Sequence, residues 1–355
     1  MMALKTSDDF LHQEIDTIII GGGPAGLSAA VNLARLRRSV LVIDDRDGRS
    51  LWGQINRNYL GFPNGIPAAK IRLAGRAQAA RYGAHFLAGQ VNFATPDGKD
   101  FMVRVSPSHE RPAHAAGRHG NVAADREDGR SHGEIELAAS LELRGRTLII
   151  AAGVRDQFPR FPGWEQCVGQ SLFWCILCDG YEAIDKTVAV VGDDEEAAET
   201  ALDLLDFTSK ITLVAGSAAG FSFSQARAAD LTNSGIAIYP YAINEYVCGN
   251  GQINALVLKN PASSRLPADM VFAYRHPIAR NEVAAMLGVE LNAIGQIVVD
   301  AEQHTNLHGV YAAGDVTSPH DHQVSAAVHE GNQAAAAANY YLYRPIQRSG
   351  GRPAR

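Results

Sequence analysis

The chain has 355 residues, four of them cysteines, and a formal net charge of -6 at pH 7. This length allows two ordinary domains with separate cores, and the acidic balance disfavours nucleic acid as a partner. Four cysteines are too few for a secreted disulfide scaffold. No apolar run reaches the ~20 residues of a membrane-spanning helix, and residues 1–14 lack the apolar core of a signal peptide. We expect a cytoplasmic protein with no membrane partner.

A strand, a glycine-rich turn and a helix follow one another near the start of the chain. Residues 15–20 are apolar and mostly branched, as in a buried strand, and residues 27–36 read as a helix with small residues on one side. The turn between them is Gly21-Gly22-Gly23-Pro24-Ala25-Gly26. Strand, Gly-x-Gly-x-x-Gly and helix in this order are typical of a dinucleotide-binding unit.

Each glycine of the motif has a separate task in such a unit. Gly21 permits the tight turn, Gly23 lets the backbone approach a pyrophosphate, and Gly26 lets helix and strand pack closely. The phosphates then meet the positive end of the helix. A second strand, 39–43, ends at Asp44, where an acid would accept ribose hydroxyls. The pattern predicts a dinucleotide site.

The chain between the first unit and the cysteines alternates helix and strand. Residues 68–82 read as an amphipathic helix, and strands are expected at 84–91, 101–106, 134–143 and 146–150. The last of these leads into Ala-Ala-Gly, which ends at Gly153. The prolines that follow suggest a crossing to another domain.

Residues 107–133 differ from their surroundings. They are crowded with Gly, Ala, His and charged residues and have almost no large apolar side chain. This composition predicts a flexible insertion between two strands of a hairpin. Four histidines lie within it, at a spacing that matches no metal-ligand pattern, and we predict no metal site: His109, His114, His119 and His132.

Two cysteines two residues apart mark the centre of the chain. Cys175 and Cys178 can close a small disulfide ring or open into a dithiol, and Asp179 follows at once. A Cys-x-x-Cys spacing usually lowers a thiol pKa, and a neighbouring acid can move the proton that sulfur exchange requires. A zinc site would need two more ligands, and Cys167 and Cys248 form no second close pair. A structural pair remains the alternative.

A second strand, turn and helix unit begins at residue 187. Its turn keeps only the first glycine, Gly192, and carries four acids, of which Asp194 stands where backbone should approach a phosphate. Acids suit a helix start but repel a pyrophosphate. The next strand, 210–214, leads to Ala215-Gly216-Ser217, with neither an acid for a ribose nor an arginine for a 2′-phosphate. We infer a fold that has lost the standard nicotinamide site.

Further strands are expected at 236–241 and 253–258, and residues 305–313 lead to Gly314-Asp315. After a strand, such an acid can reach the ribityl and phosphate end of a flavin. Residues 324–340 read as an alanine-rich helix that can pack beside it.

Taken together, the motifs resemble the low-molecular-weight thioredoxin reductase family over about residues 16–343. Four motifs in family order carry the resemblance: the first glycine turn, Asn58-Tyr59-Leu60-Gly61-Phe62-Pro63, Cys175-Ile176-Leu177-Cys178-Asp179-Gly180 and Ala312-Ala313-Gly314-Asp315. The resemblance implies FAD on the first turn, Cys178 near the flavin, Cys175 attacking the substrate and Asp179 as the acid beside them. The implied cofactor-site residues are Gly21, Gly23, Pro24, Ala25, Gly26, Asp44, Gln54, Asn58, Gly153, Gly314, Asp315, Gln323 and Val324.

The chain departs from the family where NADPH binds. The second Gly-x-Gly-x-x-Ala has Asp194 in place of its second glycine, the His-Arg-Arg signature is Ala215-Gly216-Ser217, and the Arg-Gln-Ala beside the flavin is His322-Gln323-Val324. Relatives with such losses include reductases fed by ferredoxin, enzymes with a second flavin in the old nicotinamide site, and oxygen-dependent dithiol oxidases. Asp179-Gly180 keeps the reductase form of the motif.

The resemblance implies an α/β fold of two Rossmann-like, three-layer ββα domains, the second inserted in the first. We place the FAD domain at residues 1–155 and 276–355 and a vestigial pyridine-nucleotide domain at 156–275. We expect a homodimeric FAD-dependent disulfide oxidoreductase that does not use NADPH, with ferredoxin or a second flavin as electron source. Its substrate would be a thioredoxin-like protein or a small disulfide. Alternatives are a dithiol oxidase, an NADPH reductase with a non-standard site, and a non-catalytic flavoprotein.

Overall fold

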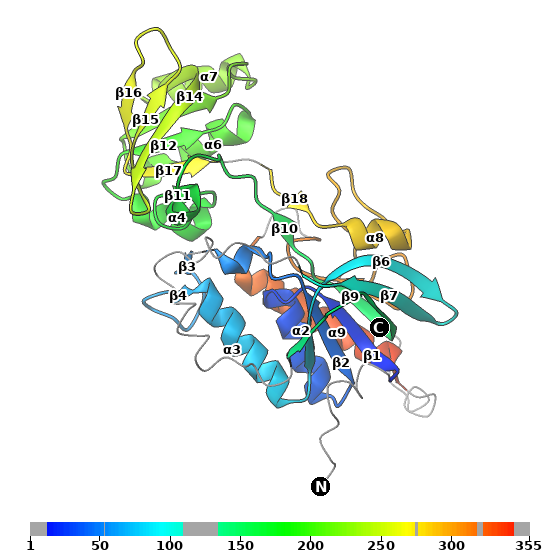
Figure 1. Ribbon diagram of the computed structural model, residues 1–355. Helices are drawn as coiled ribbons and strands as arrows, with labels where there is room; N and C mark the ends of the chain where they lie inside the picture. The colour runs from blue at the N-terminus through cyan, green and yellow to red at the C-terminus, as the bar shows by residue number, and fades with distance from the viewer. Residues whose placement is uncertain (1–12, 53, 109–133, 274–275, 318–321, 344–355) are drawn as a thin grey trace.

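The computed structural model describes residues 13–52, 54–108, 134–273, 276–317 and 322–343. It shows an α/β protein with two large sheets (Figure 1), and the second large sheet is built from the chain between strands of the first. Most of the predicted insertion at 107–133 and its four histidines lie outside the described residues. Among the described residues, no helix combines the length and the apolar character that crossing a membrane requires.

The first sheet has a parallel centre in the order β9-β1-β2-β5-β8, with β19 also paired to β9. At the centre of the sheet its strands are mostly apolar, because both faces are covered there. Their bounds are β1 Ile15–Ile20, β2 Val40–Asp44, β5 His85–Ala88, β8 Glu134–Glu136, β9 Leu141–Ile150 and β19 Val310–Ala312.

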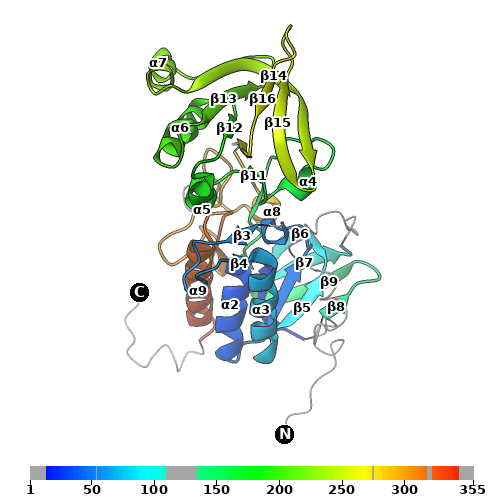
Figure 2. The same cartoon turned by 90° about the vertical axis from the view of Figure 1, so that its left-hand side faces the viewer.

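Helices cover one face of this sheet and a small antiparallel layer covers the other. On the helical face, α2 (Pro24–Arg35) packs between α3 (Ala68–Arg81) and α9 (Val324–Tyr341), as Figure 2 shows. On the opposite face, β6 (Gln90–Asp97) pairs with β7 (Asp100–Ser106), and β7 pairs with β9. These strands bury an apolar core with the short helix α8 (Glu282–Leu287). The result is the predicted three-layer ββα arrangement.

The second unit repeats this plan. Five parallel strands run in the order β11-β17-β12-β13-β14, and β15 and β16 continue from β14 as an antiparallel layer. Helices α6 and α7 bury one face, and β15 and α4 lie on the other. The strands are β11 Leu172–Phe173, β12 Val188–Val191, β13 Ile211–Gly216, β14 Ala237–Gly249, β15 Gln252–Leu258, β16 Arg265–Pro267 and β17 Met270–Ala273. The helices are α4 Trp164–Cys167, α6 Glu195–Asp203 and α7 Gln225–Asn233.

Two passages of chain join the units, and they pair with each other. β10 (Val154–Arg155) and β18 (Ile278–Ala279) form a two-stranded antiparallel ribbon next to α8 (Glu282–Leu287). The predicted domain limits fall close to this ribbon and stay a prediction.

Several strand predictions are wrong in their limits. The strand expected at 236–241 is only the first part of the longer β14 (Ala237–Gly249). The single strand expected at 84–91 is two strands, β5 and β6, because the chain leaves the parallel sheet at Gly89 and enters the antiparallel layer. The strands expected at 134–143 and 146–150 are instead a short β8 and one long β9. The first half of β9 pairs with β7 and its second half pairs with β1, so one strand serves both layers.

Candidate functional site

A cavity of about 400 Å³ lies where the first glycine turn meets the second unit. Its walls come from both units, and they hold almost every cofactor-site residue predicted from the sequence. Asn58 and Gly26 are not among the lining residues. The predicted residues in the wall are Gly21, Gly23, Pro24, Ala25, Asp44, Gln54, Gly153, Cys178, Asp179, Gly314, Asp315, Gln323 and Val324.

The glycine turn is shaped by close backbone contacts at two positions and by open space at a third. A Cβ at Gly21, which has φ +112°, would lie 2.2 Å from the Ala151 carbonyl oxygen. A Cβ at Gly26 would lie 2.0 Å from the Gly21 oxygen, whereas a Cβ at Gly23 would meet nothing within 4 Å. Gly21 and Gly26 therefore permit packing, and Gly23 leaves backbone open toward the cavity.

The backbone amides at the start of helix α2 have no side-chain cap. Gly23 is its N-cap and offers no side-chain hydrogen bond, and the first turn carries no acid. The unpaired N–H groups and the helix dipole favour an anion there. Gln54 lines the same cavity, and its side-chain carbonyl oxygen is buried without a hydrogen-bond partner. Both features fit a bound dinucleotide.

Asp44 lies at the end of β2 but already has a partner. Arg72 of α3 contacts the Asp44 carboxylate and donates a hydrogen bond to the Gly22 carbonyl oxygen at 3.2 Å. Burial opposes ionisation of Asp44, but the Arg72 guanidinium and backbone amides outweigh it and hold the pKa below its usual value. Sequence reasoning missed Arg72, whose place depends on how α3 packs.

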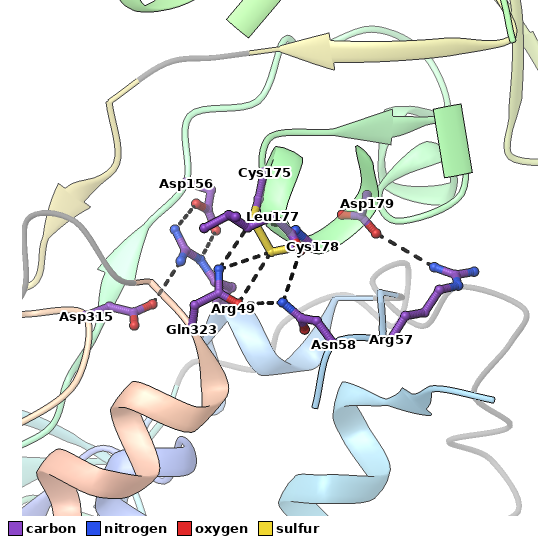
Figure 3. Close-up of a disulfide and its surroundings, with 10 residues drawn as sticks. All are labelled: Arg49, Arg57, Asn58, Asp156, Cys175, Leu177, Cys178, Asp179, Asp315 and Gln323. Carbon is purple, nitrogen blue, oxygen red and sulfur yellow. Dashed lines mark hydrogen bonds and ion pairs between the residues drawn. A yellow bond between two sulfur atoms is a disulfide. The ribbon is translucent and has the colours of Figure 1, made fainter. Parts of the chain in front are cut away.

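Asp315 also has a partner that the sequence did not reveal. Arg49 donates to Asp315 at 2.8 Å and to Asp156 at 2.9 Å, and its guanidinium carbon lies 5.9 Å from the Trp174 ring centre. The two carboxylates outweigh the cost of burial and raise the Arg49 pKa. Asp156 follows the ribbon strand β10, so Arg49 ties the Gly314–Asp315 turn to the start of the second unit (Figure 3).

Cys175 and Cys178 form a disulfide at the start of the short helix α5 (Ile176–Asp179). Cys178 lines the cavity, whereas Cys175 is not among its lining residues. Gln323, at the start of α9, places its side-chain nitrogen 3.5 Å from both sulfurs. Asn58 donates to the Gln323 side-chain oxygen at 2.8 Å and to the Leu177 carbonyl oxygen at 3.2 Å (Figure 3).

Asp179 is buried beside the disulfide, with 5% of its surface exposed. Burial raises its pKa to about 7, although Arg57, 3.7 Å away, acts in the opposite direction. Glu182 adds to the rise in pKa. A carboxyl with this pKa can hold or release a proton near neutral pH. The structure thus brings together the disulfide, the cavity and an acid that can take up or release a proton near neutral pH.

The second glycine turn is closed by its own acids. Asp194 is the N-cap of α6 and accepts a hydrogen bond from the Ala197 amide at 2.9 Å. The Asp193 carboxylate accepts one from the Ser217 hydroxyl at 2.9 Å. Segment 217–224 lies across the turn, with the Ser222 amide bonded to the Asp193 carbonyl oxygen at 2.7 Å.

A disulfide beside a cavity that a Rossmann-like glycine turn lines is the arrangement of a flavin disulfide oxidoreductase. Comparison with known proteins agrees, because the family model described as pyridine nucleotide-disulphide oxidoreductase matches residues 15–331. The chain belongs to that family, whose membership implies a flavin. The assignment of single residues to FAD or to catalysis stays a prediction.

Two relatives and one solved structure show the range of similarity. A component of the alkyl hydroperoxide reductase of Pseudomonas putida is 27% identical over 346 residues, which cover 94% of this chain but only 59% of that protein. Thioredoxin reductase of Bacillus subtilis is 27% identical over 334 residues, covering 92% and 94% of the two chains. Thioredoxin reductase from Streptococcus pyogenes shares the fold, with a TM-score of 0.77 and 22% identity over 93% of this chain and 98% of that one.

Proposed function

We propose that this chain is an FAD-dependent disulfide oxidoreductase of the thioredoxin reductase type whose flavin is not reduced by NADPH. The observation that carries the proposal is the contrast between two helix starts. Helix α2 offers uncapped amides to the cavity, whereas the amide of Ala197 in α6 is taken by Asp194. A nucleotide pyrophosphate needs such amides free.

The acids of the second turn exclude a nucleotide in two ways. Their charge repels a phosphate, by ~1 to 4 kcal/mol per close pair depending on screening. Their hydrogen bonds also hold segment 217–224 over the turn: Glu195 accepts from the Ser224 amide at 2.7 Å and from Arg227 at 3.1 Å. Ser217, at the position where the family has a cation for the 2′-phosphate, donates to Asp193 instead.

The first turn fits FAD by the open backbone at Gly23 and the unpartnered Gln54 oxygen. Bound there, FAD would supply a two-electron redox centre. Opening the disulfide then consumes two electrons and two protons and leaves two thiols. Cys178 lies on the cavity side, Gln323 orients both sulfurs, and Asp179 holds a proton that a departing thiolate can take.

We assign exchange with the substrate to Cys175, because Cys178 lines the cavity and Cys175 is not among its lining residues. The substrate would be a thioredoxin-like protein or a small disulfide. The electron donor would be ferredoxin, another low-potential carrier or a second flavin. A second flavin at Gly192 would have to place its phosphates away from Asp194.

Anaerobic stopped-flow mixing with excess NADPH tests this proposal. We expect the flavin absorption band to persist, because FAD would fill the first turn and the second turn leaves no site for the nicotinamide nucleotide. Dithionite provides the control: it should bleach the same band and then open the disulfide, taking two electrons beyond those that the flavin takes. Reduced ferredoxin should do the same at a useful rate. Bleaching by NADPH at a rate compatible with turnover would instead indicate an ordinary NADPH-dependent reductase.

A further inference from the structure

The two cysteines outside the Cys-x-x-Cys motif meet in the fold. They are far apart in the sequence, so their spacing alone does not indicate that they are neighbours. Cys167 ends helix α4, Cys248 lies near the end of β14, and the two thiols are close enough to interact electrostatically. Both belong to the core between the second sheet and its antiparallel layer.

The surrounding backbone fixes this meeting point. The Cys248 thiol donates to the Pro162 carbonyl oxygen at 3.3 Å, and the Cys167 thiol donates to the neighbouring Gly163 oxygen at 3.6 Å. A Cβ placed on Gly163 would lie 3.8 Å from the Cys248 sulfur. Because the two thiols donate to consecutive carbonyl groups, their sulfurs are held near each other.

The two thiols differ in access to solvent. Cys167 has no exposed surface, whereas Cys248 is partly exposed. Burial raises the pKa of Cys167 to about 12, and the neighbouring Cys248 adds to the rise. A thiol reacts as its thiolate, so an external reagent should react at Cys248 and leave Cys167 untouched at first.

We propose that Cys167 and Cys248 are a second redox pair, which small disulfides oxidise to an intramolecular disulfide. In the first step the Cys248 thiolate attacks a small disulfide, a bond to sulfur forms, and one small thiol departs. Cys167 then loses its proton, attacks the Cys248 sulfur and expels the second small thiol. The pair loses two electrons and two protons, and the small disulfide becomes two thiols.

The second step follows from the positions of the sulfurs. Once Cys248 is in a mixed disulfide it can carry no negative charge, so one of the factors that suppresses ionisation of Cys167 disappears. The attacking sulfur already lies beside its target, and such proximity replaces a bimolecular encounter. Cys248 therefore acts as the entry thiol and Cys167 as the resolving thiol. Two cysteines that only fill space in the core would not react in this order.

The test removes the catalytic disulfide and then follows the other pair. A full-length Cys175→Ser/Cys178→Ser double variant is reduced, freed of reductant and incubated with oxidised glutathione. It is then quenched in acid and mapped by peptide mass spectrometry. We expect the loss of two free thiols per chain and a peptide linkage between Cys167 and Cys248. Adding Cys167→Ser should instead trap glutathione on Cys248, and adding Cys248→Ser should leave Cys167 a free thiol.

Two outcomes would overturn the proposal. One is a glutathione adduct on Cys248 that persists although Cys167 is present. The other is two unreacted thiols in the folded protein while the urea-unfolded chain reacts with the same reagent. Near-ultraviolet circular dichroism of each variant shows that it is folded, and Cys167→Ala provides a second, apolar replacement at the buried position should serine disturb the core.

Discussion

The two strand, turn and helix units of this protein differ most at the first residue of the helix. In the first unit, Gly23 caps α2 without a side chain, and the helix amides face a cavity. In the second, Asp194 caps α6, and its carboxylate accepts a hydrogen bond from the Ala197 amide of that helix. The same strand, turn and helix therefore give an anion-binding site in one unit. In the other unit, a side chain of the protein itself caps the helix. A Rossmann-like fold alone is no evidence of nucleotide binding.

The largest expected effect follows from giving the first turn a side chain. Gly23→Val should fold, because Gly23 has extended backbone angles that any residue adopts and a Cβ there meets nothing. It should be nearly colourless, since the side chain fills the space for a pyrophosphate. Flavin content per chain is measured by absorbance. Asp194→Val, the matched change at the second helix cap, should stay yellow; a yellow Gly23→Val would contradict the placement of FAD.

The next effect separates FAD binding from disulfide reduction. Cys178→Ser should abolish disulfide reduction while FAD remains bound and reducible by dithionite, because the sulfur on the cavity side is lost and the first turn is unchanged. Turnover with a disulfide substrate and flavin absorbance are measured on one sample. Cys248→Ser is the control and should retain turnover. Undiminished turnover in Cys178→Ser would exclude the sulfur relay.

Asp179→Asn should slow disulfide turnover by ~10²-fold, the usual contribution of one positioned acid or base. The parent protein should lose rate as pH rises through about 7, the pKa to which burial raises Asp179, because the carboxyl then gives up its proton. The variant should lack this limb of its pH–rate profile. Asp206→Asn, on the second unit but away from the cavity, is the control. An identical pH profile in Asp179→Asn would assign the limb to another group.

The same raised pKa has a consequence for stability. A carboxyl with a folded pKa of about 7 and an unfolded value of 3.8 stabilises the fold fully only below 3.8, and that contribution is lost as pH rises to 7. Urea melts should therefore show that the free energy of unfolding of Asp179→Asn rises relative to that of the parent protein as the pH increases across this interval. No change in the difference would mean that Asp179 ionises normally.

The smallest effect tests the second turn directly. Asp194→Ala removes the cap of α6 and should cost about 1 kcal/mol of stability. It should not create reduction by NADPH, because Asp193 and Glu195 still hold segment 217–224 across the turn. Urea melts and anaerobic mixing measure the two quantities. Glu199→Ala, an exposed acid on the same helix, is the control and should leave stability nearly unchanged.

The sequence predicted what depends on local pattern. Gly21 and Gly26 have the close contacts that their spacing indicated, and the Cys175–Cys178 pair lies beside the cavity. The arginines that occupy Asp44 and Asp315 were missed, because Arg72 and Arg49 reach them only through helix packing and the crossing between units. No periodicity or spacing in a single sequence encodes such distant pairs.

Strand limits and the second thiol pair failed for a related reason. β9 continues through residues that looked like two strands, since it pairs in two layers at once. Cys167 and Cys248 are brought together by the packing of α4 against the antiparallel layer, which was not foreseen. Both cases depend on pairing between elements and not on the residues of one element.

The tryptophans of this protein gather at the junction between the two units, which affects its fluorescence. Its three tryptophans are Trp52, Trp164 and Trp174, and all three rings lie around Phe158, with centroids 5.6, 5.6 and 5.1 Å from it. Tryptophan emission, excited selectively, should therefore report on the contact between the two units and not on the rest of the molecule. Because Trp174 also lines the cavity, a flavin there should accept its excitation energy, and removing the cofactor should make the protein brighter.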